Sequence, residues 1–164
     1  MSQLEERLSE LYEEDTLQGK YLIFKLGDES YGIEIRFVIE IIGLQPITVV
    51  PELPEYIQGI INLRGKIIPV MDVRLRFKKP FREYNDRTCV IVTDIEEMTI
   101  GLIVDSVSEV LAISEAEIVS PTEMNKLYSS RYIKGIGSVG EDVKLLLDCD
   151  KLLQDKDLAL LESL

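Results

Sequence analysis

Four aspartates are the residues of this sequence best suited by type to acid–base catalysis or to metal binding. Asp72, Asp94, Asp105 and Asp148 each end or interrupt an apolar run of the chain. Two such carboxylates that converge in a cleft could act as a general acid and a general base, and several together could bind Mg²⁺ or Ca²⁺. Because no local stretch has the spacing of a metal-binding loop, we interpret these aspartates as turn and helix-cap residues. A small carboxylate hydrolase built on a β-barrel is kept as the enzymatic alternative.

Nucleophilic and cofactor chemistry finds little support in the residue types. The 164 residues include no histidine, which excludes Ser-His and Cys-His nucleophile pairs and histidine-bound zinc. The two cysteines, Cys89 and Cys149, lie far apart in apolar runs, so we expect buried free thiols rather than a disulfide or a metal site. Gly135, Gly137 and Gly140 match the form of a dinucleotide-binding string, but no helix is expected to follow them. We interpret them as glycines of a hairpin.

One pair of opposite charges suggests a binding surface instead of a reaction. Glu40 is the only charge in an otherwise apolar stretch, and Arg64 is the only cation before a turn glycine. An arginine guanidinium and a carboxylate form a planar, bidentate ion pair that fixes orientation at protein interfaces. If the two strands are neighbours, the pair forms a rim around the apolar side chains of Val38, Ile39 and Ile42. The alternative of two separately solvated side chains is equally compatible with the sequence.

The elements that would position these residues are mostly short strands. Apolar residues alternate with polar or small ones in several runs that glycine, proline or asparagine interrupts, which is typical of half-buried strands and tight turns. Strands are predicted at 21–26, 31–35 and 47–50, on both sides of the turn 62–65, at 88–93, within 99–111 (with bends near Gly101, Ser106 and Ser108), and at 135–139 and 143–147. Residues 37–42 are predicted to form a helical turn that runs into a strand. A short helix is predicted after Asp72, and the ends of the chain, 3–14 and 150–164, are predicted to be helical.

This pattern predicts a mainly β fold. Nine or ten short strands with glycine-rich turns are typical of a barrel or a sandwich. A single ten-stranded barrel would fit, but the basic, polar stretch 78–87 favours two small barrels on either side of it. Several strands are apolar on both faces, for example at 90–92 and 145–147. One face would fill a barrel, and the other must meet the sister barrel, a helix or a partner protein.

The chain is strongly acidic, with a formal net charge of −12. This charge repels phosphate, so we expect no nucleic-acid partner. Much of it lies at the ends, since residues 1–17 hold six acids against one arginine. No apolar run approaches the roughly 20 residues of a membrane span, and the N-terminus does not have the pattern of a signal peptide. We therefore expect a cytoplasmic protein that does not insert into membranes.

Three segments of the chain carry a specific signature. The most specific is the run 59–72, which reads Gly-x-x-Asn-Leu-Arg-Gly-x-Ile-x-Pro-Val-x-Asp, and the runs 31–35 (Tyr-Gly-Ile-Glu-Ile) and 101–107 (Gly-Leu-Ile-Val-Asp-Ser-Val) accompany it in order. Together they resemble the CheW family of bacterial chemotaxis coupling proteins, over about residues 18–155. The resemblance implies two five-stranded, SH3-like barrels packed on a shared apolar core, with short terminal helices. It places the connection between the barrels near 73–87 and packs the C-terminal segment back on the first barrel.

The resemblance also implies a function. Members of this family are not enzymes and use no cofactor or metal. They bridge the cytoplasmic tip of a methyl-accepting chemotaxis receptor to the regulatory domain of the histidine kinase CheA. We therefore expect a non-catalytic chemotaxis adaptor that is cytoplasmic and recruited to receptor arrays at the membrane. A CheW-like adaptor in a related surface-sensing or twitching pathway is the alternative.

Receptor binding in the family uses an apolar groove between the two barrels, which accepts a helical hairpin of the receptor. The residues that match the family's receptor-binding positions are Glu40 and Arg64, with Val38 and Gly59 beside them. Ile39 and Ile42 belong to the same expected apolar surface. Helix-in-groove recognition of this kind works through apolar anchors, and the ion pair would form the edge of the groove.

Kinase binding in the family uses pseudo-symmetric contacts between barrels. One contact is expected on the strands around Ile67 and Cys89, and a second near Glu123 and Met124. Met124 lies where the family commonly has a phenylalanine. Because a flexible thioether packs less rigidly than an aromatic ring, we expect the second contact to be weakened.

Two segments lie outside the signature, the acidic extension 1–17 and the helical end 156–164. The same signature also occurs in the regulatory domain of CheA and in the hybrid CheV proteins. A chain of 164 residues has no room for a kinase core or a receiver domain beside the two barrels. We therefore expect a standalone adaptor.

Overall fold

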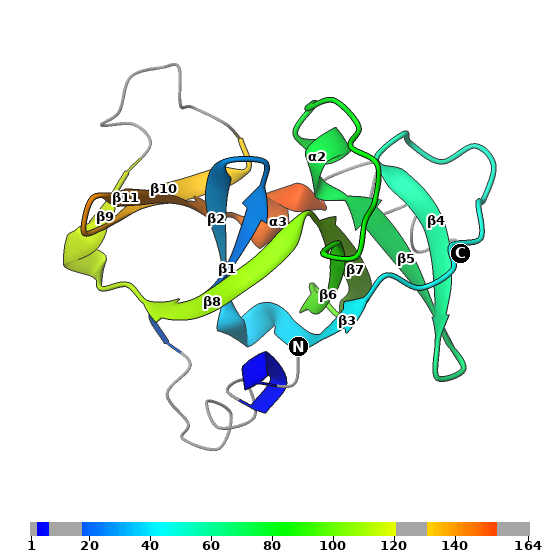
Figure 1. Ribbon diagram of the computed structural model, residues 1–164, viewed down its shortest axis with the longest axis horizontal. Helices are drawn as coiled ribbons and strands as arrows, with labels where there is room; N and C mark the ends of the chain where they lie inside the picture. Colours follow the sequence, from blue (N-terminus) through cyan, green and yellow to red (C-terminus); the bar gives the residue numbers. More distant parts are fainter. Residues whose placement is uncertain (1–2, 7–17, 121–130, 154–164) are drawn as a thin grey trace.

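The chain folds into two curved β-sheets joined by short connections (Figure 1). The structure is a computed structural model that describes residues 3–6, 18–120 and 131–153. The first sheet has the strand order β8-β1-β2-β11-β10-β9, and the second has the order β3-β6-β7-β5-β4.

The bounds of the elements follow the sequence pattern, except that the predicted strand at 47–50 is only an isolated bridge between Thr48 and Ile60. The strands of the first sheet are β1 (Lys20–Leu26), β2 (Glu29–Glu34), β8 (Ser106–Ala112), β9 (Ile118–Val119), β10 (Ile133–Val139) and β11 (Asp142–Leu147). Those of the second sheet are β3 (Val38–Gly43), β4 (Ile57–Leu63), β5 (Lys66–Asp72), β6 (Cys89–Ile95) and β7 (Met98–Val104). The short helices are η1 (Ile35–Phe37), α2 (Val73–Arg76), η2 (Glu115–Glu117) and α3 (Cys149–Leu152).

The apolar side chains form three layers that show how the sheets pack. In β1, Tyr21 and Ile23 fill the interior of the first sheet, whereas Leu22 and Phe24 face a large cluster shared by both sheets. The second sheet has its own interior cluster, made by Ile61, Ile68, Val70, Val90, Val92 and Ile103. Strands that are apolar on both faces therefore separate a barrel interior from the shared core. The prediction of a mainly β fold with two packed barrels is confirmed, although the first sheet gains a sixth, two-residue strand, β9.

The basic stretch does not divide the two barrels. It belongs to the segment 73–87, which joins β5 to β6, and both of these strands belong to the second sheet. The chain instead passes between the sheets at η1, after β2, and at Asp105, after β7. The expected connection near 73–87 was wrong because local polarity reports exposure of a segment and carries no information about which sheet its flanking strands join. The C-terminal segment does return to the first sheet, where β11 runs parallel to β2.

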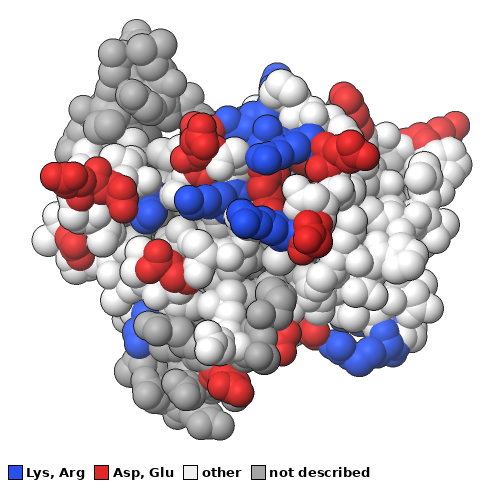
Figure 2. Space-filling model, viewed as in Figure 1, with Lys and Arg blue, Asp and Glu red and all other residues white. Residues whose placement is uncertain are grey.

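The basic stretch packs across the outside of the molecule. Asp105 accepts hydrogen bonds from Arg74 at 3.0 Å and from Arg82 at 3.1 Å, and Lys79 pairs with Glu29 of β2. Figure 2 shows Lys and Arg side chains in a band across this face, with Asp and Glu beside it. The band therefore ties the second barrel's connection to the first barrel.

Several local predictions hold. Asp72 accepts a hydrogen bond from the backbone nitrogen of Leu75 and so caps α2. The run 99–111 is divided at Asp105 rather than at Gly101. Gly101 lies inside β7, where only glycine fits because a Cβ would come within 2.7 Å of Val90. At the ends, residues 3–6 and α3 are helical, and the rest of the predicted terminal helices lies almost wholly outside the described residues. Among the helices that the structure describes, none has the length and apolar character needed to cross a membrane.

Both cysteines are buried and free, as the sequence predicted. Burial raises the pKa of the Cys89 thiol, and burial followed by the nearby Glu34 carboxylate raises that of Cys149. Because the thiolate is the reactive form, we expect neither thiol of the native protein to react at pH 7.5 with a disulfide reagent such as Ellman's reagent, and both to react after denaturation. Rapid labelling of Cys149 in the native protein would contradict the packing described here. Cys89 serves as an internal reference, since it lies closer to the surface.

Candidate functional site

The turn that presents Arg64 is set by local sequence. Arg64 and Gly65 form the two-residue loop between β4 and β5, and their φ angles are +52° and +87°. Positive φ at both loop residues is the signature of the type I′ hairpin turn, whose twist matches that of the flanking strands. The side chain of Asn62 accepts a hydrogen bond from the backbone nitrogen of Gly65 at 2.8 Å and fixes the loop. Arg64 is thereby held at the tip of the hairpin.

A bulge in β3 decides which of its residues reach the surface. The register between β3 and β6 shifts between Val38 and Glu40, so that Ile39 faces no partner residue. As a result Val38 and Ile41 both face the shared core, although their spacing would place them on opposite faces of a regular strand. Ile39 is 46% exposed, and Ile42 is half-buried against the second barrel's interior.

Glu40 and Arg64 form an ion pair that closes the second barrel. The guanidinium of Arg64 donates a hydrogen bond to the Glu40 carboxylate. The condition considered from the sequence, that their strands are hydrogen-bonded neighbours, is not met, because β3 and β4 are the opposite edges of their sheet. They meet because the sheet curls. The Arg64 side chain is 67% exposed, so the pair adds little to stability, and its position suits contact with another protein.

The other expected receptor-binding residues have supporting positions. Val38 is buried in the shared core and offers no surface. Gly59 lies in β4, where its backbone approaches Thr48 of the β3–β4 connection: Thr48 and Ile60 exchange two backbone hydrogen bonds of 2.9 Å. A Cβ at Gly59 would lie 2.1 Å from the Thr48 carbonyl oxygen. Of the expected set, Arg64 and Ile39 are exposed, and Glu40 and Ile42 are partly exposed.

The structure does not bring the two expected kinase-binding residues of the second barrel together. Cys89 is buried and pairs with Val104 at one end of β7. Ile67 is 53% exposed, and the residue before it, Lys66, donates a hydrogen bond to Thr99 at the other end of β7. Glu123 and Met124 lie outside the described residues. Ile67 is therefore the exposed anchor of this set, on the same hairpin as Arg64.

The four aspartates that could have formed a catalytic pair lie at separate places in the fold. Asp72 and Asp148 cap α2 and α3, and Asp72 also accepts a 2.7 Å hydrogen bond from the Tyr84 hydroxyl. Asp105 binds two arginines, and Asp94 is exposed on β6. Within the described ranges no group of acidic residues and cysteines could hold a metal ion. Among these four aspartates no two converge in a cleft, so the structure gives no support to the hydrolase alternative that was based on them.

Two features of the structure were missed by sequence reasoning. Arg76 is buried against the rings of Tyr56 and Tyr132, although Lys78, Arg82 and Arg87 of the same connection are exposed. Nothing in the local sequence distinguishes it from those residues. The second feature is a cleft in the first barrel, lined in part by Lys144. Here a signal was available, because Lys144 is the only cation in an apolar strand.

Comparison with known proteins covers both barrels. Residues 20–157 match the family model of the CheW-like domain. The chain is 36% identical over 149 residues to the chemotaxis protein CheW of Klebsiella aerogenes, an alignment that covers 91% of this chain and 90% of the relative. It is 32% identical over 151 residues to CheW of Treponema pallidum, covering 90% and 89%. The fold is similar to the crystal structure of the scaffolding protein CheW from Thermoanaerobacter tengcongensis, with a TM-score of 0.77 and 35% identity over 85% of this chain and 94% of that chain.

Proposed function

This chain belongs to the CheW-like domain family and is a chemotaxis adaptor, and we propose that it couples the cytoplasmic tips of methyl-accepting receptors to the regulatory domain of the kinase CheA. It acts by binding and changes no covalent bond. It works in the cytoplasm at membrane receptor arrays. The single observation that carries the proposal is the exposed Glu40–Arg64 ion pair beside the exposed Ile39.

The receptor tip docks on the surface formed by the ion pair and the isoleucines of β3. Ile39 and Ile42 supply the apolar contact, and Glu40 and Arg64 supply charges that orient a helical partner. Val38 and Gly59 support this surface without forming part of it. Val38 fixes β3 in the shared core, and Gly59 lets the β3–β4 connection lie close to β4. This division explains why buried and exposed residues share one functional surface.

The kinase docks through two contacts whose residues differ from those of the receptor surface. Ile67 is the exposed anchor of the first contact, and Cys89 supports its sheet from the inside. The second contact includes Glu123 and Met124. Because the two docking surfaces use different residues, the adaptor can bind receptor and kinase at the same time, which is what coupling requires.

The change Arg64→Glu tests this proposal. We expect it to weaken binding of a receptor-tip fragment roughly tenfold or more, because it replaces an attraction to Glu40 by repulsion and inverts the charge met by the receptor. The melting temperature should stay within about 3 °C of the wild type, because an exposed pair contributes roughly 0–1 kcal/mol. Binding is measured by isothermal titration calorimetry, with thermal melts in parallel.

The matched control is Arg87→Glu, which makes the same change of charge at another exposed arginine. It should leave receptor binding within about twofold of the wild type, a difference of roughly 0.4 kcal/mol. Binding of the CheA regulatory domain should be nearly unchanged by Arg64→Glu. Receptor affinity that is equal for the wild type and Arg64→Glu would refute this docking surface.

A further inference from the structure

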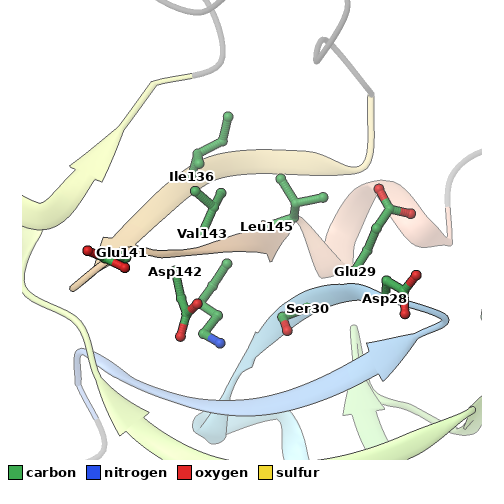
Figure 3. A pocket seen from close by; sticks show the side chains of 9 residues that line it. Asp28, Glu29, Ser30, Ile136, Glu141, Asp142, Val143 and Leu145 are labelled. Atoms are coloured by element: carbon green, nitrogen blue, oxygen red, sulfur yellow. The ribbon is translucent and has the colours of Figure 1, made fainter.

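The first barrel contains a cleft far from the Glu40–Arg64 pair. Its volume is about 400 Å³, and it lies between the β1–β2 hairpin and the β10–β11 hairpin. Figure 3 shows Ser30 of β2 beside the cleft, with Asp28 and Glu29 at one end and Glu141 and Asp142 at the other. The apolar part of the lining comes from Ile136, Val143 and Leu145.

The cleft exists because two neighbouring strands pair over only part of their length. The parallel pairing of β2 with β11 is limited to Tyr31 with Leu145 and Gly32 with Leu146. Beyond these positions the strands separate, yet β2 stays paired with β1 and β11 stays paired with β10. In an antiparallel pair every second residue turns its N–H and C=O away from its partner strand. The two diverging strands therefore present unpaired backbone groups along both walls of the cleft, which is how a sheet edge accepts an added strand.

The rim of the cleft is acidic and largely uncompensated. Four carboxylates line it, and of these Glu29 is paired with Lys79. Asp28, Glu141 and Asp142 have no ion pair with any residue that the structure describes. Val143 beside them is 55% exposed and adds an apolar side chain to this acidic rim. An occupant of this rim must carry positive charge and some apolar surface.

Lys144 points to an occupant with hydrogen-bond acceptors. It lines the cleft and is only 8% exposed, and none of the described residues gives its ammonium group a hydrogen bond or an ion pair. Its ammonium nitrogen still reaches water, because none of the described residues has a side-chain nitrogen that is both buried and without a partner. A molecule that filled the cleft would displace this water and would have to replace it with an acceptor, because burying an unpaired charge is costly. The carbonyl oxygens of an extended peptide would supply such acceptors. A free cation would not, because it offers none.

We propose that this cleft binds an extended, basic segment of a partner protein by strand addition between β2 and β11. The main chain of the segment pairs with the open edges of the two strands, and one of its carbonyls accepts a hydrogen bond from Lys144. Lysine or arginine side chains of the segment pair with Asp28, Glu141 and Asp142, and its alternate apolar side chains cover Val143 and Leu145. The site lies on the first barrel and is independent of the receptor surface on the second.

The test uses a capped hexapeptide of alternating lysine and valine, with the matching glutamate–valine peptide as a probe of opposite charge. Both are titrated into the full-length, ¹⁵N-labelled protein, and amide shifts are followed by NMR. We expect saturable shifts confined to residues 28–32 and 142–146 with the lysine peptide and none with the glutamate peptide. Raising the salt concentration from 50 to 300 mM should weaken binding severalfold, because the attraction is screened.

The double variant Asp28→Asn, Asp142→Asn should bind the lysine peptide at least fivefold more weakly. The control is Asp94→Asn, which removes one exposed carboxylate from β6 of the other barrel and should leave binding unchanged. The variant Lys144→Met, with its fold checked by its amide spectrum, should also weaken binding, which a purely electrostatic attraction would not predict. Shifts spread over the acidic surface, equal binding by both peptides, or affinity that is unaffected by the double variant would overturn the proposal.

Discussion

Replacing Gly59 by alanine is expected to destabilise the protein by about 3 kcal/mol, the combined cost of backbone strain and overpacking. The Gly59 φ angle is +149°, which residues with a side chain rarely adopt, and the new Cβ would lie 2.1 Å from the Thr48 carbonyl oxygen and 2.8 Å from its carbon. Thr48 cannot move away without breaking its two backbone hydrogen bonds to Ile60. Urea denaturation measures the loss of stability.

The matched control is Gly43→Ala at the end of β3, where an added Cβ would meet nothing within 4 Å. It should change the free energy of unfolding by less than about 0.5 kcal/mol. This comparison bears on function as well. If Gly59→Ala also weakens receptor binding, the cause is displacement of the β3–β4 connection rather than loss of a direct contact. Equal stability of the two variants would show that the close approach of Thr48 to Gly59 does not exist in solution.

The change Arg76→Ala is expected to lower the free energy of unfolding by a similar amount, about 3 kcal/mol. The guanidinium of Arg76 donates two hydrogen bonds to the Leu152 carbonyl, at 2.8 and 3.1 Å, and lies 4.4 Å and 4.8 Å from the ring centroids of Tyr56 and Tyr132. Removal would leave a buried carbonyl without these donors, at a cost of about 1–3 kcal/mol, and would remove two cation–π contacts of roughly 1 kcal/mol each. Burial lowers the pKa of this guanidinium, because the charged form is partly withdrawn from water. Deleting the charge removes this desolvation cost and so offsets part of the loss of stability.

Arg76 has this effect because it joins elements of both barrels. Arg76 ends α2 and Tyr56 precedes β4, both in the second barrel, whereas Tyr132 and Leu152 flank β10 and β11 of the first. We therefore expect Arg76→Ala to increase hydrogen exchange at α3 and at the start of β10, which mass spectrometry can follow. Arg87→Ala, at an exposed position of the same basic stretch, should stay within about 0.5 kcal/mol of the wild type. A destabilisation by Arg76→Ala as small as that of Arg87→Ala would mean that this contact does not hold the barrels together.

Much of the fold could be predicted because its signals are local. The turn at Gly65, the cap at Asp72, the helical turn before β3 and the β10–β11 hairpin all depend on residues within a few positions of each other. Two-sided apolar strands indicated that a second face must be covered, and of the three possible covers the structure shows the sister barrel. The topology was harder, because a basic stretch that looks like a boundary joins two strands of one sheet.

The candidate site was predicted in part. Glu40 and Arg64 do form the expected pair, but through the curl of the sheet, since their strands are its two edges. The bulge in β3 put both Val38 and Ile41 in the shared core, because a single inserted residue reverses the facing of everything after it. The cleft was missed because the divergence of β2 from β11 has no pattern in either strand.

The order of residues alone determined where strands and turns form, which family signature the chain carries, and which charges stand out in apolar runs. Those properties depend on neighbours in the chain, where side-chain alternation and turn chemistry act. The tertiary structure alone decided that Glu40 meets Arg64, that Gly59 must leave room for Thr48, and that Arg76 lies against two tyrosines. These contacts join residues far apart in sequence, and they arise only when twisted sheets close into barrels and pack on a common core.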